Sequence, residues 1–474
     1  MEIVTSVRDG EDAGGRGPGS LPSVVARLER LPMTGYQRQL FGVVATGWLA
    51  DQVNVALLGF VLEVLRETFH LSLVLAGILG SMTYAGQLVG NIAAGWAADR
   101  FGRRRVFQWT MVIWGLGALA SAVAWNVASL LVFRFIVGVG VGGEAPVAQA
   151  ILCEFIPASR RGRYVSLMEG FWSVGYVLSG AISFAIIPLL PREGFRVVFA
   201  LTGLLALVLL LVRRTVPESP RWLAEHGEEE RADAVLRAIE ARVERSAGRP
   251  LPKPNQITAI PVELASPVKL LFSRRYLGRT LMAGGLWFCA LLGYYGLTTW
   301  LTTLLHQQGL SIASSLGFTT LISLGGIPGF LVAAWLIEVV GRKATMAVFL
   351  LGSAAMAYAY GHPVHALLIV EGFAMQFFFF GMWCVLYAYT PELYPTMARA
   401  SGAGWASAFG RIGAILGPIV VGATLRGLGT GGVFSLGACA FVVAVLLVVI
   451  FGPETRGRVL EDLSERTETC PPLA

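Results

Sequence analysis

Charge is what this sequence has little of. Only 14% of its 474 residues are Asp, Glu, Lys or Arg, whereas 55% are hydrophobic. A soluble protein of ordinary composition carries about a quarter charged residues. Here the charges are confined to short stretches between apolar runs of roughly 20 residues, the length at which a helix crosses the hydrocarbon layer. The composition therefore excludes a soluble protein and predicts a polytopic helical membrane protein.

Cysteine and the common catalytic motifs are also scarce. None of the five cysteines has CxxC spacing, so neither a disulfide framework nor a metal site is expected. The sequence contains no GxxxxGK[ST] motif, which leaves transport driven by ATP without support. It contains no HExxH motif and no His/Asp/Ser constellation within the apolar runs, so a membrane enzyme is disfavoured. We expect no cofactor and no metal.

The net charge of +7 comes with few basic clusters, and these flank the apolar runs. Arginine at membrane-flanking turns accounts for it better than nucleic-acid binding does. The first 35 residues are polar and show no cleavable signal, so they read as a cytoplasmic tail.

Apolar runs of span length predict about twelve transmembrane helices, at 41–64, 74–97, 106–124, 128–153, 164–188, 196–212, 281–304, 314–337, 344–361, 365–389, 401–424 and 432–452. Basic residues fill every second connection, namely 100–105, 160–163, 213–280 and 342–343. This alternation predicts that both termini and the long loop are cytoplasmic. The expected divisions are a tail (1–40), a six-helix bundle (41–212), a linker with a charged, helix-prone segment (213–280), a second bundle (281–452) and a C-terminal tail (453–474).

The two halves repeat each other. The turn from Gly95 to Arg105 has a weaker copy from Ala334 to Lys343. Two further echoes occur in the same order: Glu154 followed by Arg160 matches Glu392 followed by Arg399, and Pro217-Glu218-Ser219 matches Pro453-Glu454-Thr455. Parallel halves of six spans each are typical of transporters that hold a substrate between the halves and open to one side at a time. The fold class is thus an all-α membrane protein of two pseudo-symmetric six-helix bundles.

Several stretches together resemble the major facilitator superfamily: 95–105, 134–144 and 217–223. Others narrow the resemblance to bacterial niacin-type and aromatic-acid:proton symporters, which are relatives of the synaptic-vesicle and organic-ion transporters: 167–175, 294–296, 389–396 and 404–413. The seventh span, with Leu286-Trp287-Phe288, lacks the paired glutamines usual in sugar porters. The resemblance implies a monomeric carrier in the plasma (inner) membrane that uses a small-molecule substrate and a proton.

The first span departs from that pattern. Relatives commonly carry two acids three residues apart, followed by a proline. Here Asp51 is kept, but Asn54 stands at the second position and Glu63 at the place of the proline. If proton coupling needs two acids, the second must come from elsewhere in the chain.

Ionisable residues within spans are candidates for function, because each costs about 2.5–3.5 kcal/mol to insert. Asp51 and Arg411 are both expected near the midplane, in different halves, where they could face one cavity together with Asn54. The Arg411 guanidinium offers a planar fork that matches a carboxylate. The alternative for Arg411 is a structural pair with Asp51 or Glu169.

Other site candidates follow partly from the resemblance. Glu169 matches a substrate-binding glutamine of sugar porters, and it is a candidate both for substrate contact and for carrying the proton. Arg134 belongs to the glycine-rich motif of the fourth span, which is associated with proton-coupled members. Because a flat aromatic acid needs rings to stack on, Tyr294, Trp383 and Trp405 are candidate substrate contacts.

Charged residues at the basic turns form an expected cytoplasmic gate, whose contacts exchange between conformations. Its members are Gly95, Asp99, Arg100, Gly102, Arg103, Glu144, Glu154, Arg160, Glu392 and Arg399.

The sequence favours a secondary transporter that couples an inward proton gradient to uptake of a small organic anion, an aromatic or nicotinate-like carboxylate. Two alternatives stay open. One is symport of a sugar or another neutral metabolite, and the other is a transporter-like membrane sensor that binds ligand without flux.

Overall fold

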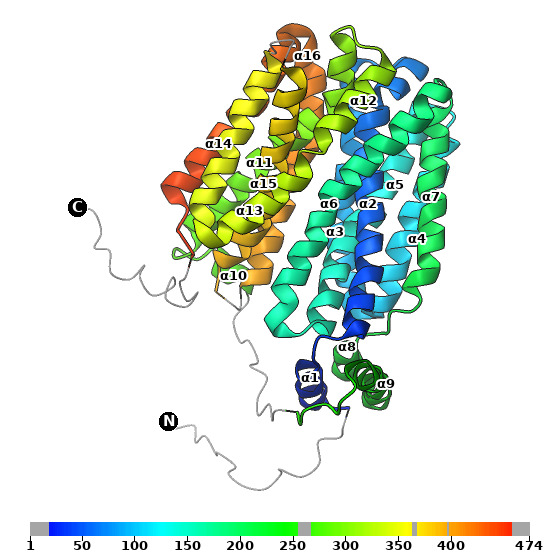
Figure 1. Ribbon diagram of the computed structural model, residues 1–474, viewed down its shortest axis with the longest axis vertical. Coiled ribbons are helices and arrows are strands. Elements are labelled where there is room, and N and C mark those ends of the chain that lie inside the picture. Colours follow the sequence, from blue (N-terminus) through cyan, green and yellow to red (C-terminus); the bar gives the residue numbers. More distant parts are fainter. Residues whose placement is uncertain (1–18, 255–266, 363–366, 396–397, 457–474) are drawn as a thin grey trace, which may run out of the picture.

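A computed structural model of the chain describes residues 19–254, 267–362, 367–395 and 398–456, and all of its regular elements are helices. Outside these residues lie most of the two predicted tails, including Cys470, and the middle of the predicted linker. Two helical bundles stand side by side (Figure 1). The N-terminal half comprises α2 (Gly35–Thr68), α3 (Leu73–Phe101), α4 (Arg103–Ala122), α5 (Val127–Phe155), α6 (Ala158–Ile186) and α7 (Gly194–Arg213).

The C-terminal half also provides six spans. It comprises α11 (Leu277–Gln307), the pair α12 (Ile312–Ser323) and α13 (Gly326–Val339), α14 (Arg342–Gly361), α15 (Leu368–Glu392) and α16 (Arg399–Phe451). The long helix α16 holds two spans, because Gly429 interrupts it with a non-helical backbone at φ 63°, a conformation that glycine adopts without strain. The predicted twelve-span, two-bundle fold is therefore confirmed.

The helices extend beyond the apolar runs that predicted them. Helix α2 begins at Gly35, inside the stretch expected to be a tail. The eighth span is broken between α12 and α13. The apolar runs mark the part of each helix that meets hydrocarbon, whereas helix ends depend on local capping, such as the side chain of Ser72 accepting a hydrogen bond from Leu75 N.

Glycines let α3 and α5 approach each other at backbone distance. A Cβ added at Gly138 would lie 2.1 Å from the Thr83 carbonyl oxygen, and one at Gly142 would lie 2.3 Å from the Gln87 carbonyl oxygen. Small residues at such spacing allow close helix packing in membranes. This packing fixes the position of Gln87, which proves important below.

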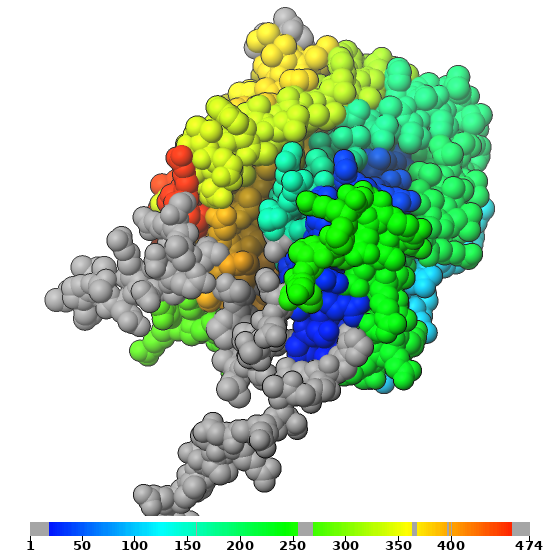
Figure 2. Space-filling view, turned by 60° about the horizontal axis from the view of Figure 1, so that its bottom comes forward, coloured from blue at the N-terminus to red at the C-terminus, as the bar shows by residue number. Residues whose placement is uncertain are grey.

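Four shorter helices lie at one end of the molecule, here called the α9 side: α1 (Leu21–Glu29), α8 (Pro220–Glu225), α9 (Glu229–Ala247) and α10 (Pro267–Leu271). Helix α9 covers the end of the N-terminal half, as Figure 2 shows in green against blue. Arg27 of α1 holds α9 through ion pairs to Asp233 (2.7 Å) and Glu240 (2.6 Å). The charged segment of the predicted linker is thus a helix docked on the first bundle.

The two halves meet on the side away from α9. Glu67 and His306 lie 3.5 Å apart at the far end of this interface. Arg411 and Gln87 are hydrogen-bonded deeper in the molecule. On the α9 side of that pair, the ion pairs described below join helices of the same half. The conformation is one in which the halves are closed together on the far side.

Candidate functional site

Arg411 lies on α16 at the boundary between the two halves. Its Nη1 donates a hydrogen bond of 2.5 Å to Oε1 of Gln87 on α3. Its Nε has no hydrogen-bond partner among the described residues. The guanidinium therefore contacts the neutral side chains of Gln87 and Tyr295 and has no recorded ion pair among the described residues.

A small cavity adjoins this arginine. Both halves contribute to its walls, with Trp48, Gln52, Gln87, Val141, Ala145 and Trp172 from the first and Tyr295, Tyr387 and Arg411 from the second among them. Its volume is about 20 Å³, and a single water needs about 10–15 Å³ on this scale. A substrate of several ring atoms can bind here only if the lining side chains move.

Aromatic rings surround the cavity. Trp172 of α6 lies 4.3 Å from the ring of Trp383 and 5.8 Å from that of Tyr294, and it stacks on Tyr295 at 6.3 Å. Tyr294 and Tyr295 also line a second small cavity on the far side, next to Tyr84. The structure thus brings two of the three expected aromatic candidates, Tyr294 and Trp383, into one cluster at the interface of the halves.

Glu169 lies on α6 three residues before Trp172, about one helical turn away, and it is 4% exposed. Gln149 donates a hydrogen bond of 3.2 Å to its Oε1, whereas its Oε2 has no partner in the described part of the chain. The charge of Arg411 acts on this carboxyl group. No ion pair between the two side chains is recorded among the described residues, so the structure does not show the alternative in which Arg411 is fixed by Glu169.

Asp51 belongs to a different group of charges, inside the N-terminal bundle. It is completely buried and interacts electrostatically with Glu144 of α5 and Arg213 of α7. Arg213 forms an ion pair with Glu144 and donates a hydrogen bond of 2.9 Å to the Phe107 carbonyl. No donor reaches either carboxylate oxygen of Asp51 among the described residues, and the carboxyl group of Glu144 lies within hydrogen-bonding reach of it. The structure therefore does not place Asp51 opposite Arg411, and it moves Glu144 from the expected gate to this buried group.

Three other candidates lie away from the cavity. The amide of Asn54 donates a hydrogen bond of 3.2 Å to the Thr202 hydroxyl within the first bundle. Arg134 binds Ser121 and lies over the Phe199 ring at 4.2 Å.

Trp405 stacks on Phe409 with an interplanar angle of 6°, and the Phe409 ring is 39% exposed on the outer face. The sequence predicts that these residues lie within spans, but the direction in which each side chain points depends on how its helix is rotated.

One cluster of possible metal ligands occurs at the far end. Carboxylate and imidazole atoms of Glu63, Glu67 and His306 come within 4.8 Å of one another. Arg66 donates hydrogen bonds to both carboxylate oxygens of Glu63. Because the Arg66 guanidinium already neutralises the buried Glu63 carboxylate, this acid is not free to bind a metal ion.

Most of the expected gate residues of the first half lie at or near the turn between α3 and α4. Gly102 has φ 94°, and a Cβ there would lie 2.5 Å from the Glu218 carboxylate. That carboxylate accepts a hydrogen bond of 3.0 Å from Arg104 N, at the first turn of α4. Arg103 forms an ion pair with Glu154 of α5. Asp99, Arg100 and Arg160 are exposed, and Gly95 is partly exposed.

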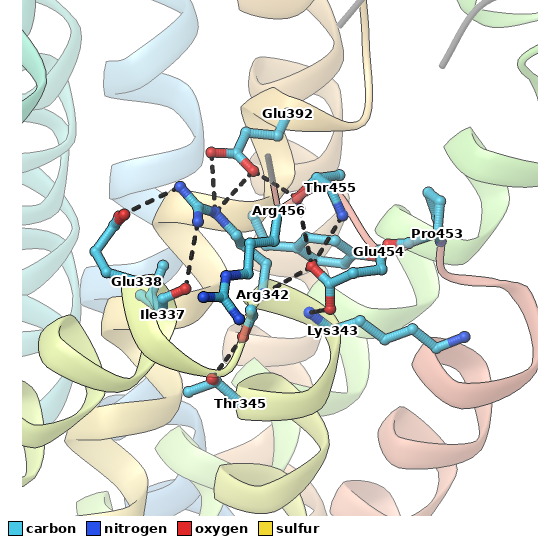
Figure 3. Close-up of polar contacts among 12 residues, drawn as sticks. Ile337, Glu338, Arg342, Lys343, Thr345, Glu392, Pro453, Glu454, Thr455 and Arg456 are labelled. Atoms are coloured by element: carbon cyan, nitrogen blue, oxygen red, sulfur yellow. Dashed lines mark hydrogen bonds and ion pairs between the residues drawn. The ribbon is translucent and has the colours of Figure 1, made fainter. Parts of the chain in front are cut away.

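The second half repeats this turn, as Figure 3 shows. Glu454 accepts hydrogen bonds from the backbone of Arg342 (2.9 Å) and Lys343 (3.1 Å). The Arg342 side chain pairs with Glu392 at 3.0 Å. Gly341 has φ 110°, and a Cβ there would lie 2.8 Å from Glu454. Arg399, the remaining gate candidate, lies partly buried at the start of α16.

These repeated turns and the two-bundle fold agree with the comparisons to known proteins. The family model described as "Sugar (and other) transporter" matches residues 37–466. The chain belongs to the sugar (and other) transporter family of the major facilitator superfamily. It is therefore a multi-pass membrane transporter and not an enzyme.

Individual members of the family narrow the comparison. The chain is 37% identical to the niacin transporter NiaP of Acinetobacter baylyi, over 93% of this chain and 99% of that protein. It is 35% identical to a putative niacin/nicotinamide transporter of Bacillus subtilis, over 90% and 98%. Among solved structures, the xylose transporter XylE of E. coli in a partially occluded inward open conformation matches with a TM-score of 0.73 at 20% identity, over 90% and 100%. The predicted resemblance to niacin-type symporters is confirmed.

Sequence reasoning missed two parts of the site in this family member. Gln87 was not singled out, because a glutamine in a span carries no charge to mark it. The sequence places Arg213 at the edge of the linker, whereas its side chain is 1% exposed between α4, α5 and α2. A signal was present in each case, since a polar side chain that falls inside an apolar helix needs a partner.

Proposed function

We propose that this transporter couples a proton gradient to uptake of a small organic anion, an aromatic or nicotinate-like carboxylate. The observation that carries the proposal is the position of Arg411, whose partly buried guanidinium donates a hydrogen bond to the neutral side chain of Gln87 between the two halves. A carboxylate can exchange with Gln87 and bind the fork at two points. The niacin-transporting relatives support the same substrate class.

Aromatic side chains would supply the remaining contacts. Trp172, Tyr295 and Tyr387 line the cavity beside Arg411 and can stack on a flat ring. The cavity of about 20 Å³ is too small for such a ring. Binding then has to open it, and side chains contributed by both halves would sense the substrate at the same time. Such a site suits alternating access, because the substrate acts on both halves at once.

The proton would bind at the buried group of Asp51, Glu144 and Arg213. Two ionised acids and one guanidinium would leave a net charge of −1 in the bundle interior, whereas one shared proton makes the group neutral. Glu144 would thus act as the second acid, in place of the one that relatives carry at the position of Asn54. Glu169, next to the cavity and with one unpartnered oxygen, is the second candidate carrier.

The α9 side would face the cytoplasm, so both termini and the linker would lie there and the conformation would be inward-facing. The basic turns at Arg103–Arg105 and Arg342–Lys343 lie on this side, as expected for cytoplasmic loops. A single chain contains both halves of the site, which suits a monomer in the plasma (inner) membrane.

Uptake by proteoliposomes under an imposed pH gradient tests this function. With the outside acidic, a labelled aromatic carboxylate should accumulate above its external concentration, and a protonophore should abolish the accumulation. Unlabelled carboxylates should compete, and sugars or cations should not.

Each alternative has its own outcome. Competition by sugars but not by carboxylates would replace the anion with a neutral substrate. Saturable binding without accumulation would indicate a sensor. Arg411→Ala should abolish anion uptake, and Arg105→Ala, an exposed arginine of the α4 turn, is the control that should leave it intact.

A further inference from the structure

A second, larger cavity lies at the α9 side of the N-terminal half. It is formed where the start of α2, the start of α4 and the end of α7 meet the inner face of α9, and its volume is about 190 Å³. A single water needs about 10–15 Å³ on this scale, so the cavity has room for a polyatomic group. The charged and polar side chains among its walls are Tyr36, Arg104, Arg214, Thr215 and Arg242.

The charge of this cavity is strongly positive. Arg104 donates from Nη2 to the Arg214 carbonyl oxygen at 3.0 Å. None of the guanidinium groups of Arg104, Arg214 and Arg242 has a carboxylate partner recorded within the described residues. The nearby Glu218 carboxylate accepts hydrogen bonds from backbone N–H groups, including that of Arg104.

Three of the acids of α9 have partners away from the cavity. Asp233 and Glu240 pair with Arg27 of α1, and Glu244 accepts a hydrogen bond from Leu251 N. Three arginines with exposed side chains thus line the cavity, and no ion pair with a carboxylate is recorded for any of them among the described residues.

A polar group of one wall residue also lacks a partner. The Tyr36 hydroxyl is inaccessible to solvent and makes no hydrogen bond to any described residue. The charge of Arg242 acts on it. A buried hydroxyl is costly when it has no partner, and an oxygen-rich anion in the cavity would supply an acceptor. This is an indication of a ligand that is independent of the arginines.

The cavity opens at the membrane border. Helices α4 and α7 carry exposed apolar side chains just beyond it, including Trp109 (47% exposed), Val208 (58%) and Leu211 (59%). Such surfaces face lipid, and arginines at this level meet the headgroups of the leaflet on the α9 side. We propose that the cavity binds a phosphate group, presented by an anionic phospholipid of that leaflet or by a soluble phosphate compound. Guanidinium forks and a tyrosine hydroxyl match phosphate oxygens.

Native mass spectrometry of the purified full-length protein tests the lipid source, with phosphatidylglycerol and phosphatidylethanolamine titrated separately. The double variant Arg214→Gln/Arg242→Gln should bind phosphatidylglycerol at least about tenfold more weakly than the unmodified protein does. The matched control is Arg38→Gln/Arg105→Gln, which removes two exposed arginines outside the cavity. It should leave the affinity unchanged.

Tyr36→Phe keeps the charge and the ring, and it should weaken binding about two- to tenfold. This variant keeps the test meaningful if the double variant unfolds.

A second arm tests the soluble source. If inorganic phosphate raises the melting temperature of the unmodified protein but not that of the Arg214/Arg242 variant, while phosphatidylglycerol binding is equal in both, a soluble phosphate compound is the ligand. Equal losses in the cavity variant and the control would mean general surface attraction and would overturn the proposal. Unchanged binding of both probes in the cavity variant and in Tyr36→Phe would overturn it as well. Because these are binding measurements, they do not depend on which substrate the transporter moves.

Discussion

Replacing Arg213 by Gln removes the only positive charge known within the described residues to act on both Asp51 and Glu144. Arg213 is 1% exposed, and the two acids are completely buried. After the replacement, each acid must either take up a proton or stay charged without a cation. Removing one partner of a buried ion pair costs about 3–5 kcal/mol. Loss of the hydrogen bond from Arg213 to the Phe107 carbonyl, 2.9 Å in length, adds about 1 kcal/mol.

Thermal unfolding of the purified variants, followed by tryptophan fluorescence across a range of pH, measures this cost. Arg213→Gln should be strongly destabilised near neutral pH. The loss should shrink at lower pH, because protonation neutralises both acids. In the double variant Glu144→Gln/Arg213→Gln one acid remains, so the double variant should be more stable than Arg213→Gln alone, with a coupling energy of about 1–3 kcal/mol.

Two results would refute this reasoning. One is a loss below about 1 kcal/mol for Arg213→Gln, the size of an exposed ion pair. The other is a loss that does not depend on pH. Glu144→Gln extends the test to transport. It leaves one acid and one guanidinium, which are neutral together without a proton, so substrate accumulation should no longer follow the pH gradient.

Gly138→Ala should destabilise the N-terminal bundle by about 1–3 kcal/mol, because its Cβ would lie 2.1 Å from the backbone oxygen of Thr83; an unchanged melting temperature would contradict the close packing. Burial raises the pKa of Glu240, but hydrogen bonds from Arg27 and Arg30 outweigh it and hold that pKa below the ordinary value of 4.5. The contact between α1 and α9 is therefore fully stabilised above pH 4.5 and weakens as pH falls through the lowered value. Spin labels on α1 and α9 should separate only at such acid pH, and Arg27→Ala should separate them at neutral pH.

Sequence patterns were most informative where a feature is local. The repeated turns could be predicted in both halves, and the structure shows why. Gly102 and Gly341 have positive φ, and Glu218 and Glu454 bind the helix starts beside them. Each of these contacts joins two short segments, and each segment carries a sequence motif that can be recognised by itself. The count of spans was equally accessible, because it depends only on length and apolar content.

The site was harder to predict, because it depends on helix rotation and on partners far apart in the chain. Position along a helix predicts a depth for Asp51 and Arg411, but it does not predict the direction of their side chains. Asp51 points toward Glu144 and Arg213, and Arg411 points toward Gln87. A rotation of one helix by a single residue, about 100°, would change these partners. No pattern within one span carries that information.

The central claim is that Arg411 recognises a carboxylate, and a comparison between a carboxylate and its amide tests it most directly. The two ligands have the same ring and nearly the same shape, and they differ in charge. Equilibrium binding of nicotinate and nicotinamide should be measured on the unmodified protein and on Arg411→Gln. The unmodified protein should prefer the carboxylate by at least about tenfold, since hydrogen bonds between charged groups contribute about 1.5–3 kcal/mol. Arg411→Gln should remove that preference. The same preference in both proteins would contradict the account.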